Sequence, residues 1–321
     1  MFSSIPDFVS LPLGLVLLVL GAETLVRGAS ALAARLRVSE LAVGLTVVAF
    51  GTSMPELSVS VFAGAAGRSD VLLGNAIGSN LFNVLVILGV SAVVFPLAVQ
   101  RRTVRREIPL SLVLTAFVLL MVFDDPVWPH GLTGLSRLEG GVLLVLFAAF
   151  LWYIARNLGT DQQPVAAPPV AGWLIAFLTV GGLLLLTVGG RLVVDGAVGI
   201  ARTAGISDRV VSLTIVSAGT SLPELATSVV AAARRKPDLS VGNVVGSNIF
   251  NLTAALGTGL LVRPATVLHG SAVDLLVVIV ATAALMLAMF TGGRRRLDRW
   301  EGILFVCLYA GYIVWLLAGQ R

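Results

Sequence analysis

The sequence predicts an all-α polytopic membrane protein with ten transmembrane helices, arranged as two inverted five-helix repeats with helices broken at the midplane. Two observations lead to this prediction. Hydrophobic residues make up 57% of the 321 residues and charged residues only 12%, whereas a soluble domain has about 25% charged residues. In addition, the polar segment at 51–83, GTSMPELSVSVFAGAAGRSDVLLGNAIGSNLFN, occurs again at 219–251 with 18 of 33 positions identical.

The apolar residues form long runs rather than amphipathic stripes, and a helix needs roughly 20 apolar residues to cross a bilayer. The runs are separated by short loops, which leave no room for a soluble domain. Their order along the chain predicts ten spans near 8–27, 39–66, 70–95, 107–123, 136–155, 172–202, 207–233, 238–262, 271–290 and 300–318.

The duplication divides the chain into a first repeat at 1–160, a linker at 161–171 that contains the sequence QQPVAAPP, and a second repeat at 172–321. The two copies of the polar segment keep one spacing of 168 residues throughout. Five spans is an odd number, so two tandem copies must enter the membrane from opposite sides. This arrangement is an inverted repeat, and it would bring the two polar segments together near the midplane.

The net charge of +5 indicates orientation rather than a nucleic-acid partner, because the basic residues are distributed unevenly among the predicted loops. Fourteen Lys and Arg residues lie on one side of the membrane, and six lie on the side that holds both termini. The positive-inside rule therefore places both termini outside the cytoplasm, in a protein of the cell membrane. Its expected macromolecular environment is lipid, and we expect it to function as a monomer.

The first part of the duplicated segment, GTSxPE, predicts a broken helix. Pro55 and Pro223 have no backbone N–H, so the carbonyl groups of Gly51 and Gly219 lose their usual donors. Within a membrane, such a break occurs only where protein, water or an ion satisfies the backbone. The polar side chains beside the two breaks all offer oxygen: Thr52, Ser53, Glu56, Thr220, Ser221 and Glu224.

The second part, GNxxGSNxFN, predicts a helix with one polar face. Asn75, Ser79 and Asn83 are four residues apart, so they stack on the same side of the helix. Gly74 and Gly78 have the same spacing, which would let another helix approach closely, and the second copy repeats the whole arrangement. These second-copy residues are Gly242, Asn243, Gly246, Ser247 and Asn251.

Together the two copies supply two carboxylates, several hydroxyl groups and several amide oxygens, which suits a hard cation such as Ca²⁺ with its roughly 6–8 oxygen ligands. A charged side chain at mid-bilayer costs about 3 kcal/mol, so the two glutamates are expected to hold cations or protons. A proline kink, a glycine pair or a single buried Glu is, alone, often structural. Their joint occurrence twice, in register, favours cation transport by a protein that is not an enzyme and has no cofactor.

A further charged pair occurs in each repeat. Glu23 and Arg27 lie four residues apart in the first predicted span, and their repeat-mates Arg191 and Asp195 carry the opposite signs. Each pair fits a local ion pair near a helix end. Alternatively, each could bridge moving and fixed parts of the protein in one state.

On these residues, the chain resembles the cation/Ca²⁺ exchanger superfamily and most closely its prokaryotic sodium/calcium exchanger branch. The resemblance covers nearly the whole chain and implies Na⁺/Ca²⁺ antiport by alternating access, in which the first and sixth spans slide past a rigid core. It implies that Glu56 and Glu224 are central ligands for both ions. It further implies that Thr52, Ser53, Thr220 and Ser221 add oxygens, that Ser79 and Ser247 line flanking sodium sites, that Asn83 and Asn251 complete the centre, and that the carbonyls of Ala49 and Ser217 are ligands.

Two positions depart from the pattern of this superfamily. Some potassium-dependent relatives have Asp at the position of Asn251, so the neutral residue here favours a potassium-independent exchanger. Ser217 replaces a small apolar residue, and its hydroxyl group could bond the backbone or reach a sodium site. Since two Glu balance one Ca²⁺, entry of more than two Na⁺ would make the exchange electrogenic.

Two other activities are weighed against this interpretation. Proton/calcium exchange is the alternative, but the acidic or His-containing motif usual in proton-coupled relatives is absent. An intramembrane protease would use an acid pair within hydrogen-bond reach of one water, and it would leave the doubled Ser and Asn residues without a role.

Overall fold

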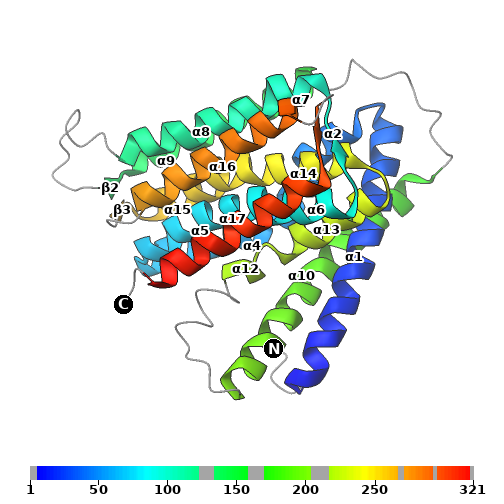
Figure 1. Ribbon diagram of the computed structural model, residues 1–321, viewed down its shortest axis with the longest axis horizontal. Coiled ribbons are helices and arrows are strands. Elements are labelled where there is room, and N and C mark those ends of the chain that lie inside the picture. The colour runs from blue at the N-terminus through cyan, green and yellow to red at the C-terminus, as the bar shows by residue number, and fades with distance from the viewer. Residues whose placement is uncertain are drawn as a thin grey trace.

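The computed structural model describes residues 6–122, 134–157, 170–203, 217–266, 271–291 and 295–318, and these are almost entirely helical (Figure 1). The predicted linker is largely outside this range, as is the start of the span predicted at 207–233. In the first half of the sequence the elements are α1 (Asp7–Leu36), α2 (Glu40–Val43), η1 (Gly44–Val48), α3 (Ala49–Thr52), α4 (Met54–Ala66), α5 (Ser69–Phe82), η2 (Asn83–Ile87), α6 (Leu88–Val94), β1 (Leu97–Ala98), α7 (Arg101–Arg105), α8 (Glu107–Val122), β2 (Gly134–Leu135) and α9 (Arg137–Asn157).

The second half of the sequence gives a closely parallel series. Its elements are α10 (Gly172–Thr203), α12 (Ser217–Gly219), α13 (Leu222–Ala233), α14 (Pro237–Phe250), η4 (Asn251–Ala255), α15 (Leu256–Val262), β3 (Ala265–Thr266), α16 (Ser271–Thr291), β4 (Arg296–Leu297) and α17 (Arg299–Ala318). The elements labelled η are single π-helical turns inside longer helices.

The described helices are long and apolar enough to establish an integral membrane protein. Seven of them could each cross a membrane, and an eighth span is formed if the bent pair Glu40–Thr52 and Met54–Ala66 is counted as one. This pair bends by 47°. Leu222–Ala233 is a shorter apolar helix, and the predicted residues that would precede it are partly outside the described range.

The helices form two groups (Figure 1). α1 and α10 lie side by side and lean at an angle to the remaining long helices. Their contact is backbone on backbone: a Cβ atom at Gly182 would lie 2.6 Å from the backbone nitrogen of Leu25, and one at Gly189 would lie 2.8 Å from that of Leu18. Glycine at these positions lets the two helices pack this closely.

The second group is a bundle with α5 and α14 at its centre. In α14, every residue from Leu239 to Phe250 is buried, whereas the outer helices expose apolar side chains such as Val145 and Val280. A membrane helix that faces lipid keeps its apolar surface, so this pattern places α14 inside the protein and α9 and α16 outside. Gly242 and Gly246 of α14 lie against the backbone of Leu41 and Leu45, as their spacing predicts. The same prediction is wrong for Gly74 of α5, where a Cβ atom would have no described atom of another element within 4 Å.

Two very short sheets join the two halves of the sequence. β1 pairs with β4 antiparallel, and β2 pairs with β3 in the same way. Each pair takes one strand from each half. These strands are only two residues long, and the sequence pattern did not predict them.

The first span is longer than predicted, since α1 continues from the expected end at 27 to Leu36. The added segment contains several alanines, which favour helix, and little in it breaks the helix before Arg37. Arg37 then ends α1 in the left-handed conformation, and its N–H bonds the carbonyl groups of Ala33 and Ala34. The other described spans begin and end within a few residues of their predicted limits.

Candidate cation site

Both GTSxPE segments break their helices. α3 ends at Thr52, Ser53 has φ −86° and ψ 10°, and α4 begins at Met54 with Pro55 in its first turn. In the second copy Ser221 has φ −91° and ψ 9°, and Pro223 occupies the equivalent position of α13. Proline is well tolerated in the first turn of a helix, where its missing N–H has no intrahelical partner to lose.

The two breaks face each other. The Ser53 hydroxyl group donates to Glu224 Oε1 at 2.7 Å, and the Ser221 hydroxyl group donates to Glu56 Oε1 at 2.9 Å. Each serine therefore bonds the glutamate of the other repeat. Both carboxylates are at most 1% exposed. In addition, Thr220 lies beside Glu56 and Thr52 lies beside Glu224.

Each glutamate retains one unsatisfied oxygen. Within the described part of the chain, Glu56 Oε2 and Glu224 Oε2 are buried and have no hydrogen-bond partner. No ion pair among the described residues includes either carboxylate. No Arg of the described chain therefore holds either buried Glu. A buried carboxylate without a donor or a cation is costly, so this pair of oxygens is suited to a bound cation.

The polar faces of α5 and α14 contact each other, since Asn80 Nδ2 donates to the Asn248 carbonyl at 3.1 Å. Ser79, Asn83, Ser247 and Asn251 are all at most 3% exposed. Asn83 Nδ2 donates to Asn248 Oδ1 at 2.9 Å. Other buried polar atoms here have no partner among the described residues: Asn83 Oδ1, Ser247 Oγ, and both side-chain polar atoms of Asn251.

π-helical turns begin at Asn83 and at Asn251, the last residues of the two duplicated segments. Such turns occur frequently at functional sites, because the extra residue changes the direction in which nearby side chains and carbonyl groups point. A third π-helical turn, η1, precedes the first helix break.

The Ala49 carbonyl, predicted as a ligand, already accepts a hydrogen bond from the Ser53 N–H at 3.0 Å. The Thr52 hydroxyl is also 3.3 Å from it, but the single proton of that hydroxyl has a nearer acceptor in the Val48 carbonyl at 3.0 Å. Ser217 begins α12, and its side chain lies outside the description, so the two interpretations of its hydroxyl group both remain predictions.

Asn75 and Asn243 hold the backbone around the glutamates. Asn75 Nδ2 donates to the Glu56 carbonyl at 2.9 Å and to Ser60 Oγ at 3.1 Å. Asn243 Nδ2 donates to Ser228 Oγ at 2.9 Å and, more weakly, to the Glu224 carbonyl at 3.4 Å.

The sequence placed Asn75 and Asn243 on the polar face but did not identify this supporting role, and it did not single out Ser60 or Ser228. Their identity in both copies was the available signal. The donor set of the region is hard oxygen, and the described residues contain no cluster of three or more His, Cys, Asp or Glu. Two carboxylates combined with neutral oxygens fit Ca²⁺ or Na⁺ better than a soft transition metal.

A family model described as "Sodium/calcium exchanger protein" matches residues 7–156 and 174–318. The chain belongs to the sodium/calcium exchanger family. This exchanger is similar to the putative antiporter CaxA of Alkalimonas amylolytica, with 39% identity over 93% of this chain and 95% of that protein. It is also similar to the inner membrane protein YrbG of Escherichia coli (strain K12), with 38% identity over 78% of each chain.

A solved structure gives the same result for the fold. The sodium-calcium exchanger NCX_Mj, soaked with 2.5 mM Na⁺ and 1 mM Sr²⁺, matches this exchanger with a TM-score of 0.84 and 33% identity, over 97% of this chain and 98% of that one. The family consists of transporters rather than enzymes. Membership therefore supports exchange of Ca²⁺ for another cation across a membrane, as the buried oxygens suggest.

Proposed function

We propose that the protein is a secondary active antiporter that exchanges Na⁺ for Ca²⁺ by alternating access, independently of K⁺. One observation carries the proposal. Two buried glutamates on facing helix breaks each bond a serine of the opposite repeat and each keep one oxygen unpaired. This arrangement gives a cation two carboxylate oxygens at the point where both repeats meet.

In this proposal Glu56 and Glu224 are the central ligands. Hydroxyl and amide oxygens complete the roughly 6–8 ligands that Ca²⁺ requires. These supporting groups come from Thr52, Ser53, Ser79, Asn83, Thr220, Ser221, Ser247 and Asn251, with the carbonyls of Ala49 and Ser217 as further candidates. Because Asn251 is neutral, the centre has two negative charges. One Ca²⁺ balances them, and three Na⁺ would leave a net charge of +1.

The inverted repeat and the ten spans belong to the same proposal. Their support is the reciprocity of the contacts: the pair Ser53–Glu224 becomes the pair Ser221–Glu56 when the two repeats are exchanged at the spacing of 168. The supporting contacts of Asn75 and Asn243 are related in the same way. Two halves that can exchange roles provide what alternating access needs. We place both termini outside, from the uneven distribution of Lys and Arg.

The test is ⁴⁵Ca²⁺ uptake into proteoliposomes loaded with Na⁺, K⁺ or choline, with and without a pH gradient. We expect internal Na⁺ alone to drive uptake, internal K⁺ and choline to give none, and Glu56→Gln or Glu224→Gln to reduce uptake at least about a hundredfold, since each removes a central charge. Asp70→Asn is the control, because Asp70 pairs with Arg68 and its side chain is 49% exposed. Uptake driven only by the pH gradient would instead establish proton/calcium exchange and contradict the sodium sites.

A further inference from the structure

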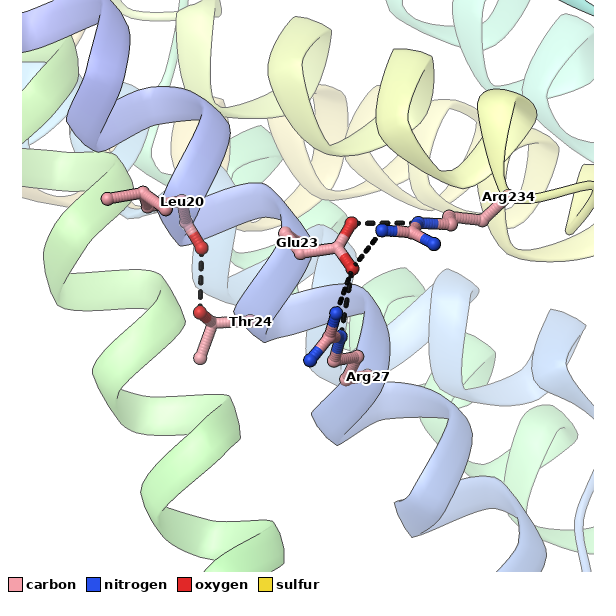
Figure 2. Close-up of polar contacts among 5 residues, drawn as sticks. All are labelled: Leu20, Glu23, Thr24, Arg27 and Arg234. Carbon is pink, nitrogen blue, oxygen red and sulfur yellow. Dashed lines mark hydrogen bonds and ion pairs between the residues drawn. The ribbon is translucent and has the colours of Figure 1, made fainter.

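Glu23 of α1 is held by two arginines (Figure 2). Arg27, one turn along the same helix, donates from Nε to Glu23 Oε1 at 2.8 Å. Arg234 comes from the C-terminal end of α13 and bonds both carboxylate oxygens, with Nε 2.9 Å from Oε2 and Nη2 2.5 Å from Oε1. A forked arginine–carboxylate contact of this kind fixes geometry as well as adding energy.

The local interpretation of the charged pairs thus holds for Glu23 and Arg27 only in part. Glu23 lies well inside α1 rather than near its end, and its second partner comes from a different helix. Among the described residues, no ion pair joins the repeat-mates Arg191 and Asp195, and both are exposed. The two repeats therefore differ at this position.

The contact with Arg234 joins the two groups of helices. On one side is the α1–α10 pair, which the close glycine contacts hold together as a unit. On the other side is α13, which carries Glu224 near its start and ends beside Arg234. α10 also covers both helix breaks, since a Cβ atom at Gly51 would overlap with Leu183 and one at Gly219 would overlap with Val194. The position of the α1–α10 pair is therefore coupled to the cation site.

The packing of this pair is asymmetric. α1 packs along α13, whereas α10 makes no comparable contact with α4 in the part of the chain that the structure describes. α10 and α4 are the repeat-mates of α1 and α13. Exchanging the roles of the two halves would give a second arrangement, in which α10 packs along α4 and α1 no longer contacts α13.

The charged residues of the contact between Glu23 and Arg234 are not repeated in the other half. At a spacing of 168, Glu23 corresponds to Arg191 and Arg234 corresponds to Ala66. The residues after Ala66 are Gly67 and Arg68, so Arg191 would approach another cation rather than an acid. The forked ion pair can form in the observed arrangement but has no counterpart in the exchanged one.

We propose that Glu23 and Arg234 form a latch that holds the α1–α10 pair against α13 in one of two arrangements, and so biases the conformational equilibrium of the ion-free protein. This inference rests on the alternating access of the proposed function. It makes the two residues positioning residues, which act on the site through the helices and do not touch the ion.

The experiment measures the conformational equilibrium directly. Spin labels are placed at Leu36→Cys, at the end of α1, and at Arg299→Cys, at the start of α17, in a full-length Cys307→Ser chain in lipid nanodiscs. Distances between the labels are measured by pulsed electron paramagnetic resonance without Na⁺ or Ca²⁺. In the unchanged chain we expect one dominant distance. We expect Glu23→Gln or Arg234→Gln to raise the population of a second distance, relative to that of the dominant one, about threefold, which is the effect usual for a partly exposed ion pair.

Arg235→Gln is the matched control. It removes the same charge from the neighbouring exposed position, for which the described residues provide no ion-pair partner. It should leave the distances unchanged. The double variant Glu23→Gln/Arg234→Gln should equal either single variant, because both remove the same contact between α1 and α13, whereas the Glu23–Arg27 pair lies within α1. Raising choline chloride from 0.05 M to 0.5 M should shift the unchanged chain in the same direction.

Several results would overturn the latch. These are distances in Glu23→Gln and Arg234→Gln that match those of the unchanged chain, an equal shift in Arg235→Gln, and a double variant whose effect is the sum of the two single effects. None of these measurements uses ion transport. A failed uptake assay therefore removes the proposed function, whereas unchanged distances remove only the latch.

Discussion

At the scale of single residues, the site depends on hydrogen bonds that each repeat donates to the glutamate of the other. Each glutamate receives one hydrogen bond from a serine of the other repeat, and none of the described residues supplies the cationic partner that a buried carboxylate usually needs. The serine bonds orient the carboxylates without neutralising them. If the proposed function is right, the transported ions supply the charge balance, so an empty site should be less stable than an occupied one.

Asn243 offers a test of how the site is supported, since it links both repeats. Besides its two donated bonds, its Oδ1 lies 3.2 Å from the Thr52 hydroxyl of the first repeat, whose one proton also has the Val48 carbonyl within reach at 3.0 Å. Asn243→Ala removes the two donated hydrogen bonds, of about 0.5–1.5 kcal/mol each. We expect the Ca²⁺ concentration for half-maximal uptake to rise about tenfold, as measured in proteoliposomes loaded with Na⁺.

Asn157→Ala is the control for this prediction, because Asn157 lies at the end of α9 and donates to the Tyr153 carbonyl, away from the site. Its half-maximal concentration should stay unchanged. If Asn243→Ala lowered only the amount of folded protein and left this concentration unaltered, Asn243 would have a purely structural role.

The sequence predicts which residues would surround a cation but not how they share their hydrogen bonds. Glu56 and Glu224 could be identified because carboxylates beside a proline break have few structural explanations in a membrane. The role of Asn243 could not be identified in this way. A spacing of four residues places a side chain on a face, but the neighbour on that face depends on how the helices pack.

At the scale of elements, proline and glycine determine most of what the sequence predicts. The breaks at Ser53 and Ser221 follow from the prolines that come two residues later. The π-helical turns and the two-residue strands were not predicted, because they depend on tertiary contacts rather than on residue type. The extension of α1 to Leu36 was missed because polar, alanine-rich sequence can continue a helix beyond the apolar run that marks a span.

Adjacent glycines of α10 provide a matched test of the α1–α10 contact. A Cβ atom at Gly182 would lie 2.6 Å from the backbone of Leu25, whereas the described residues leave space beside Gly181. Gly182→Ala should force the helices apart, at a cost of roughly 1–3 kcal/mol. Gly181→Ala should keep or raise stability, because alanine favours helix over glycine by about 1 kcal/mol.

The measurement for this pair of variants is the midpoint of thermal unfolding in detergent, followed by size-exclusion chromatography. We expect a lower midpoint for Gly182→Ala than for the unchanged chain and an equal or higher one for Gly181→Ala. Equal midpoints for the two variants would show that the close approach of α1 and α10 contributes little to stability.

At the scale of the whole molecule, the proposal predicts that transport moves charge. If three Na⁺ leave for each Ca²⁺ that enters, one positive charge leaves per cycle. A potential that is positive inside the vesicle should then accelerate Ca²⁺ uptake, and a negative one should slow it, since moving one charge across 100 mV changes the free energy by about 2.3 kcal/mol.

This prediction is checked by clamping the vesicle potential with valinomycin and K⁺ gradients during ⁴⁵Ca²⁺ uptake from Na⁺-loaded proteoliposomes. K⁺ gradients without valinomycin are the control for a direct effect of K⁺. Uptake that does not respond to the clamped potential would indicate two Na⁺ per Ca²⁺ and an electroneutral cycle.

The crossed strand pairs have a consequence for how the protein is made. β2 precedes α9 but pairs with β3, and α9 packs on α15, so part of the first half finds its partners only in the second. These partners are synthesised more than a hundred residues later. During synthesis, the first broken helix is therefore present before Ser221, the residue that donates to Glu56, has been made. Biogenesis, and not only transport, requires a means of protecting an unfinished polar site.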